Sequence, residues 1–273
     1  MGYKLVEKKE IAPKIFDLIF EAPEIAQHAK AGQFVIVRVD EKGERIPLTI
    51  AQKFDRQIRL VVQVVGKSTE KLSKLSVGSE VEDIAGPLGN PSEIDEFGNV
   101  LVIGGGVGIA AILPIVKALY EAGNYTNVII GARSKDFLIL MDDISKYSHN
   151  LIVTTDDGSF GMKGLVTDAF RSLIKEGKEI KIAWAVGPVV MMENCSKVAS
   201  EFGIPIWTSL NPVMIDGTGM CGGCRVEVNG VIKFACADGP EFDGRYVNWE
   251  DLKKRLVQYK EYEMKAKKFN NRG

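Results

Sequence analysis

The sequence predicts an N-terminal antiparallel β-barrel, then a doubly wound parallel α/β sheet, and last a loop, hairpin and helix. Three observations predict this order. Short β-branched strands separated by turns occupy residues 1–96, whereas apolar strands alternate with amphipathic helices over residues 97–210. Three of the four cysteines then fall between residues 216 and 236. We therefore expect three units, with boundaries at 1–96, 97–210 and 211–273.

The first unit is expected to be a small barrel because its apolar residues are grouped in short, partly alternating runs. Residues 15–20, 33–38 and 58–65 are such runs, and turn residues separate them. One helix, over residues 69–75, is predicted among these strands. Many short strands with a single short helix are typical of an antiparallel barrel.

The second unit has the alternating pattern of a parallel sheet. Its apolar strands are separated by helical segments, of which the first is predicted over residues 109–121. Such strands are buried on both faces, as in a doubly wound sheet. They are predicted at residues 100–103, 128–130, 151–153, 182–186 and 204–207. From Trp249 onwards we predict a polar helix, lysine-rich at its end, that faces solvent or contacts another subunit.

The composition is that of an ordinary globular protein. Thirty-five basic residues stand against 36 acidic ones, so the net charge of −1 gives no reason to expect binding to nucleic acid or to an anionic membrane. Residues 1–10 are charged and do not form a signal peptide. The longest apolar run, residues 100–116, is interrupted by glycines and is not expected to span a membrane. Clustered cysteines without a secretion signal indicate a cytoplasmic protein that binds metal.

A glycine-rich loop at residues 104–109 lies between a predicted strand and a predicted helix. Bare backbone there lets a phosphate approach the helix N-terminus, whose partial positive charge stabilises it. The alternative is that these glycines only turn the chain. In a doubly wound sheet we favour a bound nucleotide. A second turn, Gly187-Pro188, ends a later strand and is by itself no more than a turn.

The cysteine-rich segment has the spacing Cys221-x2-Cys224-x11-Cys236, and Asp216 stands five residues before the first cysteine. Glycines surround the first pair, so the backbone can fold tightly around them. The segment after Cys224 alternates like a hairpin with an Asn-Gly turn, which would return Cys236 to the other two cysteines. These features predict a metal site with three thiolates and one carboxylate as ligands.

Two kinds of metal fit a sulfur-rich site of four ligands, zinc and an iron–sulfur cluster. Zinc is less favoured, because the segment has neither a second Cys-x2-Cys pair nor a histidine. The loop looks more like that of a 2Fe–2S cluster, although a carboxylate ligand is unusual there. A third possibility is a pair of unligated structural cysteines. Cys195 lies in a helical segment and is expected to be a buried, unligated side chain.

Two short motifs of the barrel carry groups that could bind phosphate. Residues 45–50 place Arg45, a proline and Thr49 on one strand, and Gly66-Lys67-Ser68-Thr69 precedes the predicted helix. Neither motif is specific alone. A surface arginine and a helix cap explain them equally well.

Taken together, the order of these motifs resembles that of the ferredoxin–NADP reductase superfamily over nearly the whole chain. The strand at Arg45, the helix start at Gly66, the loop at Gly105 and the turn at Gly187 match the family's motifs in that order. The appended cysteine loop narrows the resemblance to the electron-transfer subunits of dihydroorotate dehydrogenase and their relatives. Asp216 stands where those subunits have a cysteine, as in the small subunits of NADH-dependent reduced ferredoxin:NADP oxidoreductase, which the sequence resembles most.

The resemblance implies three cofactors: FAD at the barrel, NAD(H) at the parallel sheet and a 2Fe–2S cluster near the flavin. Thr49 is the catalytic candidate, expected to hydrogen-bond near the reactive edge of the flavin. Arg45 is expected to hold the pyrophosphate together with Ser68 and Thr69. The cluster ligands would be Asp216, Cys221, Cys224 and Cys236. The residues expected to bind the other cofactors are Arg45, Ile46, Pro47, Leu48, Thr49, Val64, Gly66, Ser68, Thr69, Gly105, Gly106, Val107, Gly108, Ile109, Arg133, Gly187, Pro188 and Met191.

The choice between NAD(H) and NADP(H) depends on charges after the second and third parallel strands. Arg133 and Lys135 could pair with a 2′-phosphate, whereas Asp136 and Asp156-Asp157 would repel one. The charges alone do not decide between NAD(H) and NADP(H). The resemblance favours NAD(H).

The resemblance also implies a partner, because nothing in the chain resembles a site for a separate organic substrate. We expect a heterodimer with a larger iron–sulfur flavoprotein subunit. That subunit would exchange electrons with ferredoxin as part of electron bifurcation. Two other hypotheses remain. One is the electron-transfer subunit of a dihydroorotate dehydrogenase, and the other is a zinc-stabilised regulatory module that binds nucleotide without catalysis.

Overall fold

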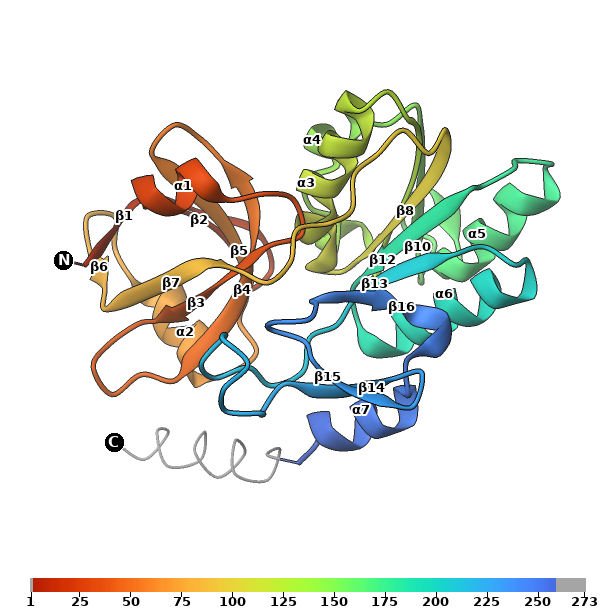
Figure 1. Cartoon of the computed structure of the whole chain (residues 1–273). Coiled ribbons are helices and arrows are strands. Elements are labelled where there is room, and N and C mark those ends of the chain that lie inside the picture. The colour runs from red at the N-terminus through yellow and green to blue at the C-terminus, as the bar shows by residue number, and fades with distance from the viewer. Residues whose placement is uncertain (1, 259–273) are drawn as a thin grey trace.

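The computed structural model describes residues 2–258, and it confirms the predicted fold class. An antiparallel sheet and a parallel sheet lie side by side, and the C-terminal hairpin and helix lie beside the parallel-sheet unit (Figure 1). The antiparallel sheet has the strand order β6-β1-β2-β5-β4-β3-β7. Its strands are β1 (Tyr3–Ala12), β2 (Ile15–Glu21), β3 (Phe34–Arg38), β4 (Arg45–Lys53), β5 (Gln57–Gln63), β6 (Glu80–Val81) and β7 (Asp83–Leu88).

The antiparallel sheet closes into a near-barrel through the segment that contains β6 and β7. Val81 pairs with Tyr3 of β1, and Asp83 pairs with Arg38 of β3, so the chain passes from one edge of the sheet to the other at Glu82. The Glu82 amide still donates to the carbonyl of Val39. This closure leaves few strand-edge groups unpaired, as in other small barrels.

The barrel carries two short helices, and the prediction of a single one was therefore wrong. Helix α1 (Pro23–His28) was missed because it has only six residues, too few to show a helical period. It begins with a proline in its first turn, where a missing N–H costs nothing. Helix α2 (Lys67–Lys74) is the predicted helix, but it begins two residues earlier than expected.

The parallel sheet has the order β11-β10-β9-β8-β12-β13-β16, so the strand order reverses between β8 and β12. Ligands bind at the carboxyl ends of the strands at such a switch point. Its strands are β8 (Asn99–Gly105), β9 (Tyr125–Ala132), β10 (Asn150–Thr155), β11 (Met162–Lys163), β12 (Ile182–Val186), β13 (Ile206–Ser209) and β16 (Glu241–Asp243). The last of these is antiparallel to β13 and was not predicted.

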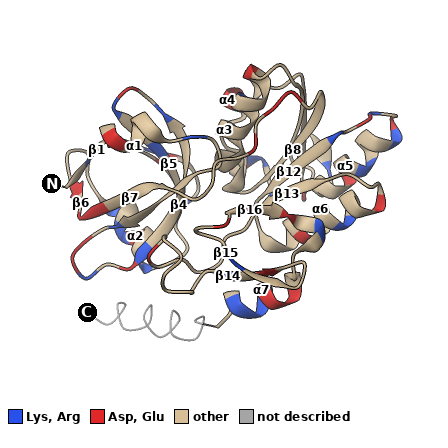
Figure 2. Cartoon of the chain, in the orientation of Figure 1, with Lys and Arg blue, Asp and Glu red and all other residues tan. Residues whose placement is uncertain are grey.

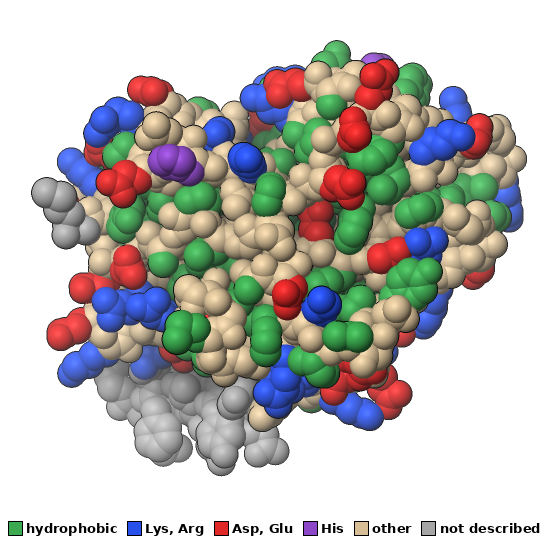
Figure 3. Space-filling model, in the orientation of Figure 1, with side chains coloured by type: hydrophobic (Ala, Val, Ile, Leu, Met, Phe, Trp, Pro, Cys, Tyr) green, Lys and Arg blue, Asp and Glu red, His purple; other side chains and the backbone are tan. Residues whose placement is uncertain are grey.

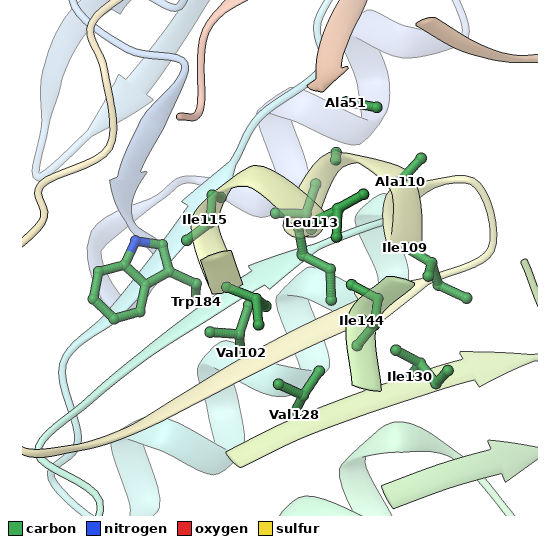
Figure 4. Packing of buried hydrophobic residues seen from close by; sticks show 14 of the residues in the cluster. Ala51, Val102, Ile109, Ala110, Leu113, Ile115, Val128, Ile130, Ile144 and Trp184 are labelled. Atoms are coloured by element: carbon green, nitrogen blue, oxygen red, sulfur yellow. The ribbon is translucent and has the colours of Figure 1, made fainter. Parts of the chain in front are cut away.

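Helices cover both faces of the parallel sheet. The helical elements are α3 (Gly108–Glu121), η1 (Lys135–Phe137), α4 (Met141–Ser145), α5 (Val166–Lys175) and α6 (Val189–Glu201). The helices α5 and α6 pack on one face, and α3 and α4 pack on the other. Helix α3 also packs against the barrel, because Ala51 of β4 belongs to the same buried cluster as Ala110 and Leu113 (Figure 4). The long interface along α3 thus joins the barrel to the sheet.

The C-terminal segment forms the hairpin that the Asn-Gly turn predicts. Strands β14 (Arg225–Val228) and β15 (Val231–Phe234) pair antiparallel, and Asn229 and Gly230 between them have φ angles of 52° and 73°. Positive φ at both positions is what a tight hairpin turn requires. The turn η2 (Gly244–Tyr246) and helix α7 (Trp249–Leu256) follow. The rest of the predicted C-terminal helix lies outside the described residues.

Basic and acidic residues are interspersed along the barrel, the sheet and the C-terminal segment (Figure 2). This distribution agrees with the net charge of −1. Of the helices described, none is both long and apolar enough to cross a membrane.

Candidate functional site

A cavity of about 290 Å³, which we name the central cavity, lies between the barrel and the carboxyl ends of β8 and β12. Three segments predicted to bind cofactors line it, namely residues 47–49 of β4, residues 105–108 of the glycine loop, and the turn at Gly187 and Pro188. Residues 209–211 and Met214, just before the cysteine loop, complete the wall. The switch point of the sheet therefore faces the barrel strand that carries Thr49.

A second cavity of about 380 Å³, which we name the lateral cavity, adjoins the central one. Residues 105–107, Gln63 and Pro188 line both cavities, so the two form a continuous space over the glycine loop. Arg133 and Met191, which were predicted to bind nucleotide, line the lateral cavity. An elongated ligand can therefore reach from Arg133 past the glycine loop to Thr49.

The geometry of the glycine loop explains why small residues stand there. Gly106 has a φ of 56°, in the left-handed region that favours glycine. At Gly108 an added Cβ would lie 2.3 Å from the carbonyl oxygen of Val186, so only glycine lets α3 begin this close to β12. Helix α3 thus directs its N-terminus, with its partial positive charge, at the space between β8 and β12.

The barrel motifs are only partly in the cavities. Thr49 lies in the central cavity, whereas Arg45 lies outside it, with its guanidinium 3.9 Å from the Asp83 carboxylate. The Ser68 hydroxyl donates to Glu44, 2.6 Å away, and the Thr69 hydroxyl accepts the amide N–H groups of residues 65 and 66. Both hydroxyls therefore already have hydrogen-bond partners nearby, and the contacts of Thr69 are those of a residue that caps a helix. Of the other predicted residues, Ile46, Val64, Gly66 and Ile109 line neither cavity.

Of the charged residues that bear on the nucleotide choice, some line the lateral cavity and others do not. Arg133 and Asp156 both line the lateral cavity, and the Arg133 guanidinium stacks over the Phe137 ring at 4.8 Å. Asp157 is held instead by the hydroxyl and amide of Ser159. Of the charged residues on which the nucleotide prediction depends, Arg133 and Asp156 are therefore the two that line the lateral cavity.

The cysteine loop brings two of its three thiols together. The sulfur atoms of Cys224 and Cys236 lie 3.1 Å apart and are buried, whereas Cys221 is exposed. Within residues 2–258 no group of three or more His, Cys, Asp or Glu side chains is arranged as a set of metal ligands, so the predicted set of four stays a prediction. Burial raises the pKa of the Cys195 thiol to about 12, consistent with its predicted structural role in α6.

Asp216 organises the approach to this loop. Its two carboxylate oxygens accept the backbone N–H of Thr218 at 3.0 Å and that of Cys221 at 2.7 Å. These contacts, the Thr218 amide first, hold the pKa of the carboxyl below its usual value. The carboxylate thus lies directly beside the first cysteine, charged at neutral pH.

The donor set of the loop fits an iron–sulfur cluster. Backbone N–H groups point at all three sulfurs: that of Gly219 at Cys236, that of Gly223 at Cys221, and that of Cys236 at Cys224, at 3.1, 3.4 and 3.5 Å. Such N–H···S contacts stabilise the negative charge of thiolate-bound clusters. The residues present could therefore hold such a group.

The cysteine loop also packs directly on the barrel. Cys224 and Cys236 share a buried cluster with Phe34 and Ile36 of β3. An added Cβ at Gly217 would lie 2.6 Å from the side chain of Leu88, so the loop backbone lies against the barrel wall. Phe34 also lines the central cavity, so it belongs both to the wall of that cavity and to the buried cluster that contains the two thiols.

Sequence reasoning missed several residues of the cavities. Gln63 lines both, and Phe34, Met214 and Pro240 line the central one. Gln63 could have been found, because a polar residue at the end of an apolar strand in the barrel needs an explanation. The others are apolar residues with no distinctive local signal.

Comparison with known proteins identifies this architecture. A family model described as the iron–sulfur cluster binding domain of dihydroorotate dehydrogenase B matches residues 211–248. A Thermotoga maritima protein described as a homologue of the dihydroorotate dehydrogenase B (NAD+) electron transfer subunit is 55% identical, over 95% of this chain and 92% of its own. The chain belongs to the family of dihydroorotate dehydrogenase B electron-transfer subunits and their homologues. The corresponding subunit of Streptococcus pneumoniae is 33% identical, over 88% of this chain and 94% of its own.

Solved structures agree with membership of this electron-transfer family. A chain from the structure of NADH-dependent reduced ferredoxin–NADP oxidoreductase, described in connection with flavin-based electron bifurcation, superposes with a TM-score of 0.93. It is 53% identical and matches over 98% of this chain and 97% of its own. A cytochrome P450 reductase from Amycolatopsis, 23% identical, shares the fold with a TM-score of 0.63, over 73% of this chain and 65% of its own. The protein is thus an electron-transfer subunit of the ferredoxin–NADP reductase superfamily, with an iron–sulfur cluster domain.

Proposed function

We propose that this chain passes electrons between NAD(H), FAD and a 2Fe–2S cluster, and to or from a larger iron–sulfur flavoprotein subunit in a cytoplasmic heterodimer. This is the function of a small subunit of NADH-dependent reduced ferredoxin:NADP oxidoreductase, which serves electron bifurcation. The observation that carries the proposal is the likeness to that structure over nearly the whole of both chains, at a TM-score of 0.93 and 53% identity.

The arrangement of the cavities supports this function. The lateral cavity offers Arg133 and Asp156 to one end of a dinucleotide, and the glycine loop and the N-terminus of α3 to its pyrophosphate. The central cavity offers Thr49 at the position expected for a flavin ring. In this proposal the Thr49 hydroxyl donates a hydrogen bond at the flavin edge, and Arg45 turns from Asp83 to the flavin pyrophosphate.

A nicotinamide transfers two electrons as a hydride and a cluster carries one at a time, so the flavin supplies the conversion between them. The chain's own residues hold these sites close to one another. Phe34 and Met214 line the central cavity and belong to the same buried cluster as Cys224 and Cys236. They exclude water between the central cavity and the buried thiols, which keeps the path for an electron short and apolar.

Exposed apolar side chains beside the cysteine loop support a partner subunit. Met220 is 89% exposed, and Ile215 and Val213 are 51% and 38% exposed. Met220 immediately precedes the exposed Cys221, and the other two lie earlier in the same segment. Large apolar residues grouped around an exposed ligand candidate are typical of a surface that another protein covers.

The visible absorption spectrum of the purified chain tests the cofactors, because flavin and an iron–sulfur cluster are coloured and zinc is not. We expect flavin and cluster bands, two irons per chain, and bleaching of both bands by NADH. A colourless protein that contains zinc would contradict the proposal and support the regulatory module.

A second function is favoured by the descriptions of the curated relatives, namely electron transfer for a dihydroorotate dehydrogenase. The cofactors would be the same, but the partner would differ. Purification of the native complex separates the two functions, because an iron–sulfur flavoprotein partner supports our proposal and a partner with FMN in a β/α barrel supports the second.

A further inference from the structure

We infer that a third cavity, on the other side of the barrel–sheet interface, binds a small organic anion with a flat apolar body. This rear cavity has a volume of about 240 Å³ and lies between residues 50–53 at the end of β4, the C-terminal half of α3, and α4. Nothing in the proposed electron transfer uses it. The inference therefore stands independently of that function.

The rear cavity is separate from the cofactor cavities although it shares an element with the central one. Helix α3 lines the central cavity with its first turns, up to Ala111, and the rear cavity from Leu113 onwards. No residue lines both. Between them lies the buried contact of β4 with α3, to which Ala51 and Ala111 belong, with 1% and 9% of their surfaces exposed.

The charge of the rear cavity is positive. Its wall carries four lysines, Lys30, Lys53, Lys117 and Lys146, against two acids. Both acids already have cationic partners: Asp143 accepts from Arg59 and from Lys146, each at 3.0 Å, and Glu121 lies 3.8 Å from Lys117. In the described part of the chain, no carboxylate lies within ion-pair distance of the amines of Lys30 and Lys53.

Both of these lysines line the rear cavity from the barrel side. Lys30 follows α1, and Lys53 ends β4. The space-filling view shows a notch between the barrel and the helices α3 and α4, with basic side chains at its rim (Figure 3). Two uncompensated amines at the rim of one concave site would attract an anion.

The floor of the rear cavity sets the shape of the ligand. Ala31, Ile50, Pro114 and Ala118 line it, so both the barrel and helix α3 contribute apolar side chains to the cavity. The Tyr147 ring adds an aromatic surface, with Lys117 Nζ 5.7 Å from its centroid. A flat apolar body fits between such walls while its anionic group meets the lysines. At about 240 Å³ the space suits a ligand smaller than those of drug-sized pockets, which start near ~300 Å³.

Benzoate and its neutral analogue benzamide test the site, on the full chain loaded with its cofactors and saturated with NAD+. We expect benzoate to bind with a Kd of about 1 mM or less and benzamide at least about tenfold more weakly, by ligand-observed NMR. Added salt should weaken only the benzoate signal, because the charges are exposed. Equal binding of the two probes, or no saturable benzoate binding up to about 10 mM, would overturn the inference.

Variants locate the bound probe. The double change Lys30→Met and Lys53→Met should weaken benzoate about tenfold, at about threefold for each exposed ionic contact. Ala118→Phe should fill the floor and abolish binding. Lys175→Met removes the same charge from α5, outside the cavity, and should change nothing. Benzoate binding that survives both cavity variants comes from another site and refutes the assignment.

Discussion

The sulfur atoms of Cys224 and Cys236 lie 3.1 Å apart although twelve positions separate the two residues in the chain. The β14–β15 hairpin produces this proximity, because Arg225 pairs with Phe234, Cys224 directly precedes Arg225, and Cys236 lies two residues after Phe234. The hairpin register, and not the glycine-rich segment 217–223, therefore places half of the predicted ligand set. That segment places only Cys221, beside the Asp216 carboxylate.

Asp216 can act as a cluster ligand or as the residue that orders the loop, and two substitutions separate these roles. If it is a ligand, Asp216→Cys should keep the iron at a lower reduction potential, because a thiolate donates more charge than a carboxylate. Asp216→Asn should lose iron, although its amide oxygen can still accept a backbone N–H. Iron content and the EPR spectrum of the reduced chain measure both outcomes.

If Asp216 only holds the cysteine loop in place and does not bind the cluster, the outcomes should be reversed. In that case the Asn variant would retain iron, because it preserves an acceptor for Thr218 or Cys221. Asp216→Ala, which removes both functions, should lose iron in either case and serves as the reference.

Replacement of Arg45 by alanine should weaken FAD binding about ten- to a hundredfold. A charge-assisted contact to the pyrophosphate contributes about 1.5–3 kcal/mol, and 1.4 kcal/mol corresponds to a factor of about ten. Flavin release followed by fluorescence measures the affinity. Asp83→Asn is the matched control, because it removes the partner that Arg45 has here at 3.9 Å without removing the guanidinium. Equal loss of FAD in both variants would mean that the ion pair only supports the barrel.

Elements with a distinctive local pattern were predicted, whereas very short elements such as α1 and β16 were missed. The hairpin was predicted because a two-residue hairpin turn requires positive φ at both positions. Asn229 and Gly230 adopt positive φ more readily than most residues do. Strand β16 was missed because its three residues acquire a strand conformation only by pairing with β13. In the same way, the sequence gives no sign that Phe34 is more than an ordinary core residue. Its position between the cysteine loop and the central cavity depends on contacts that are distant in the chain.

The stability of the protein should depend on the titration of Glu241. Burial raises the pKa of this carboxyl to about 7, although the Ser92 hydroxyl, which donates to it at 2.7 Å, favours the charged form. The neutral acid binds its proton more tightly in the folded chain than in the unfolded one. Its contribution to stability is therefore full below the ordinary pKa of 4.5 and is lost as the pH rises through about 7.

Glu241→Gln removes this dependence. We expect the variant to gain stability relative to the unchanged protein between pH 5 and pH 8, by about 3 kcal/mol at most. Thermal unfolding of both proteins across this range measures the difference. Glu93→Gln, at an exposed position close to Ser92 in the chain, is the control and should show no such trend. A constant difference between the Glu241 variant and the unchanged protein would show that the carboxyl is charged throughout.

The nucleotide preference should be NAD(H), with Asp156 as the residue that enforces it. Asp156 and Arg133 both line the lateral cavity, and Arg133 is already stacked on Phe137, so the carboxylate is the freer group to meet a ribose. NADH should therefore bleach the flavin faster and at lower concentration than NADPH. Asp156→Asn should narrow this ratio by about tenfold, since one repulsive contact costs on the order of 1.4 kcal/mol. Arg133→Ala should weaken NADPH more than NADH. Stopped-flow reduction of the three proteins by each nucleotide measures these ratios, and tighter reduction of the unchanged chain by NADPH would reverse the assignment.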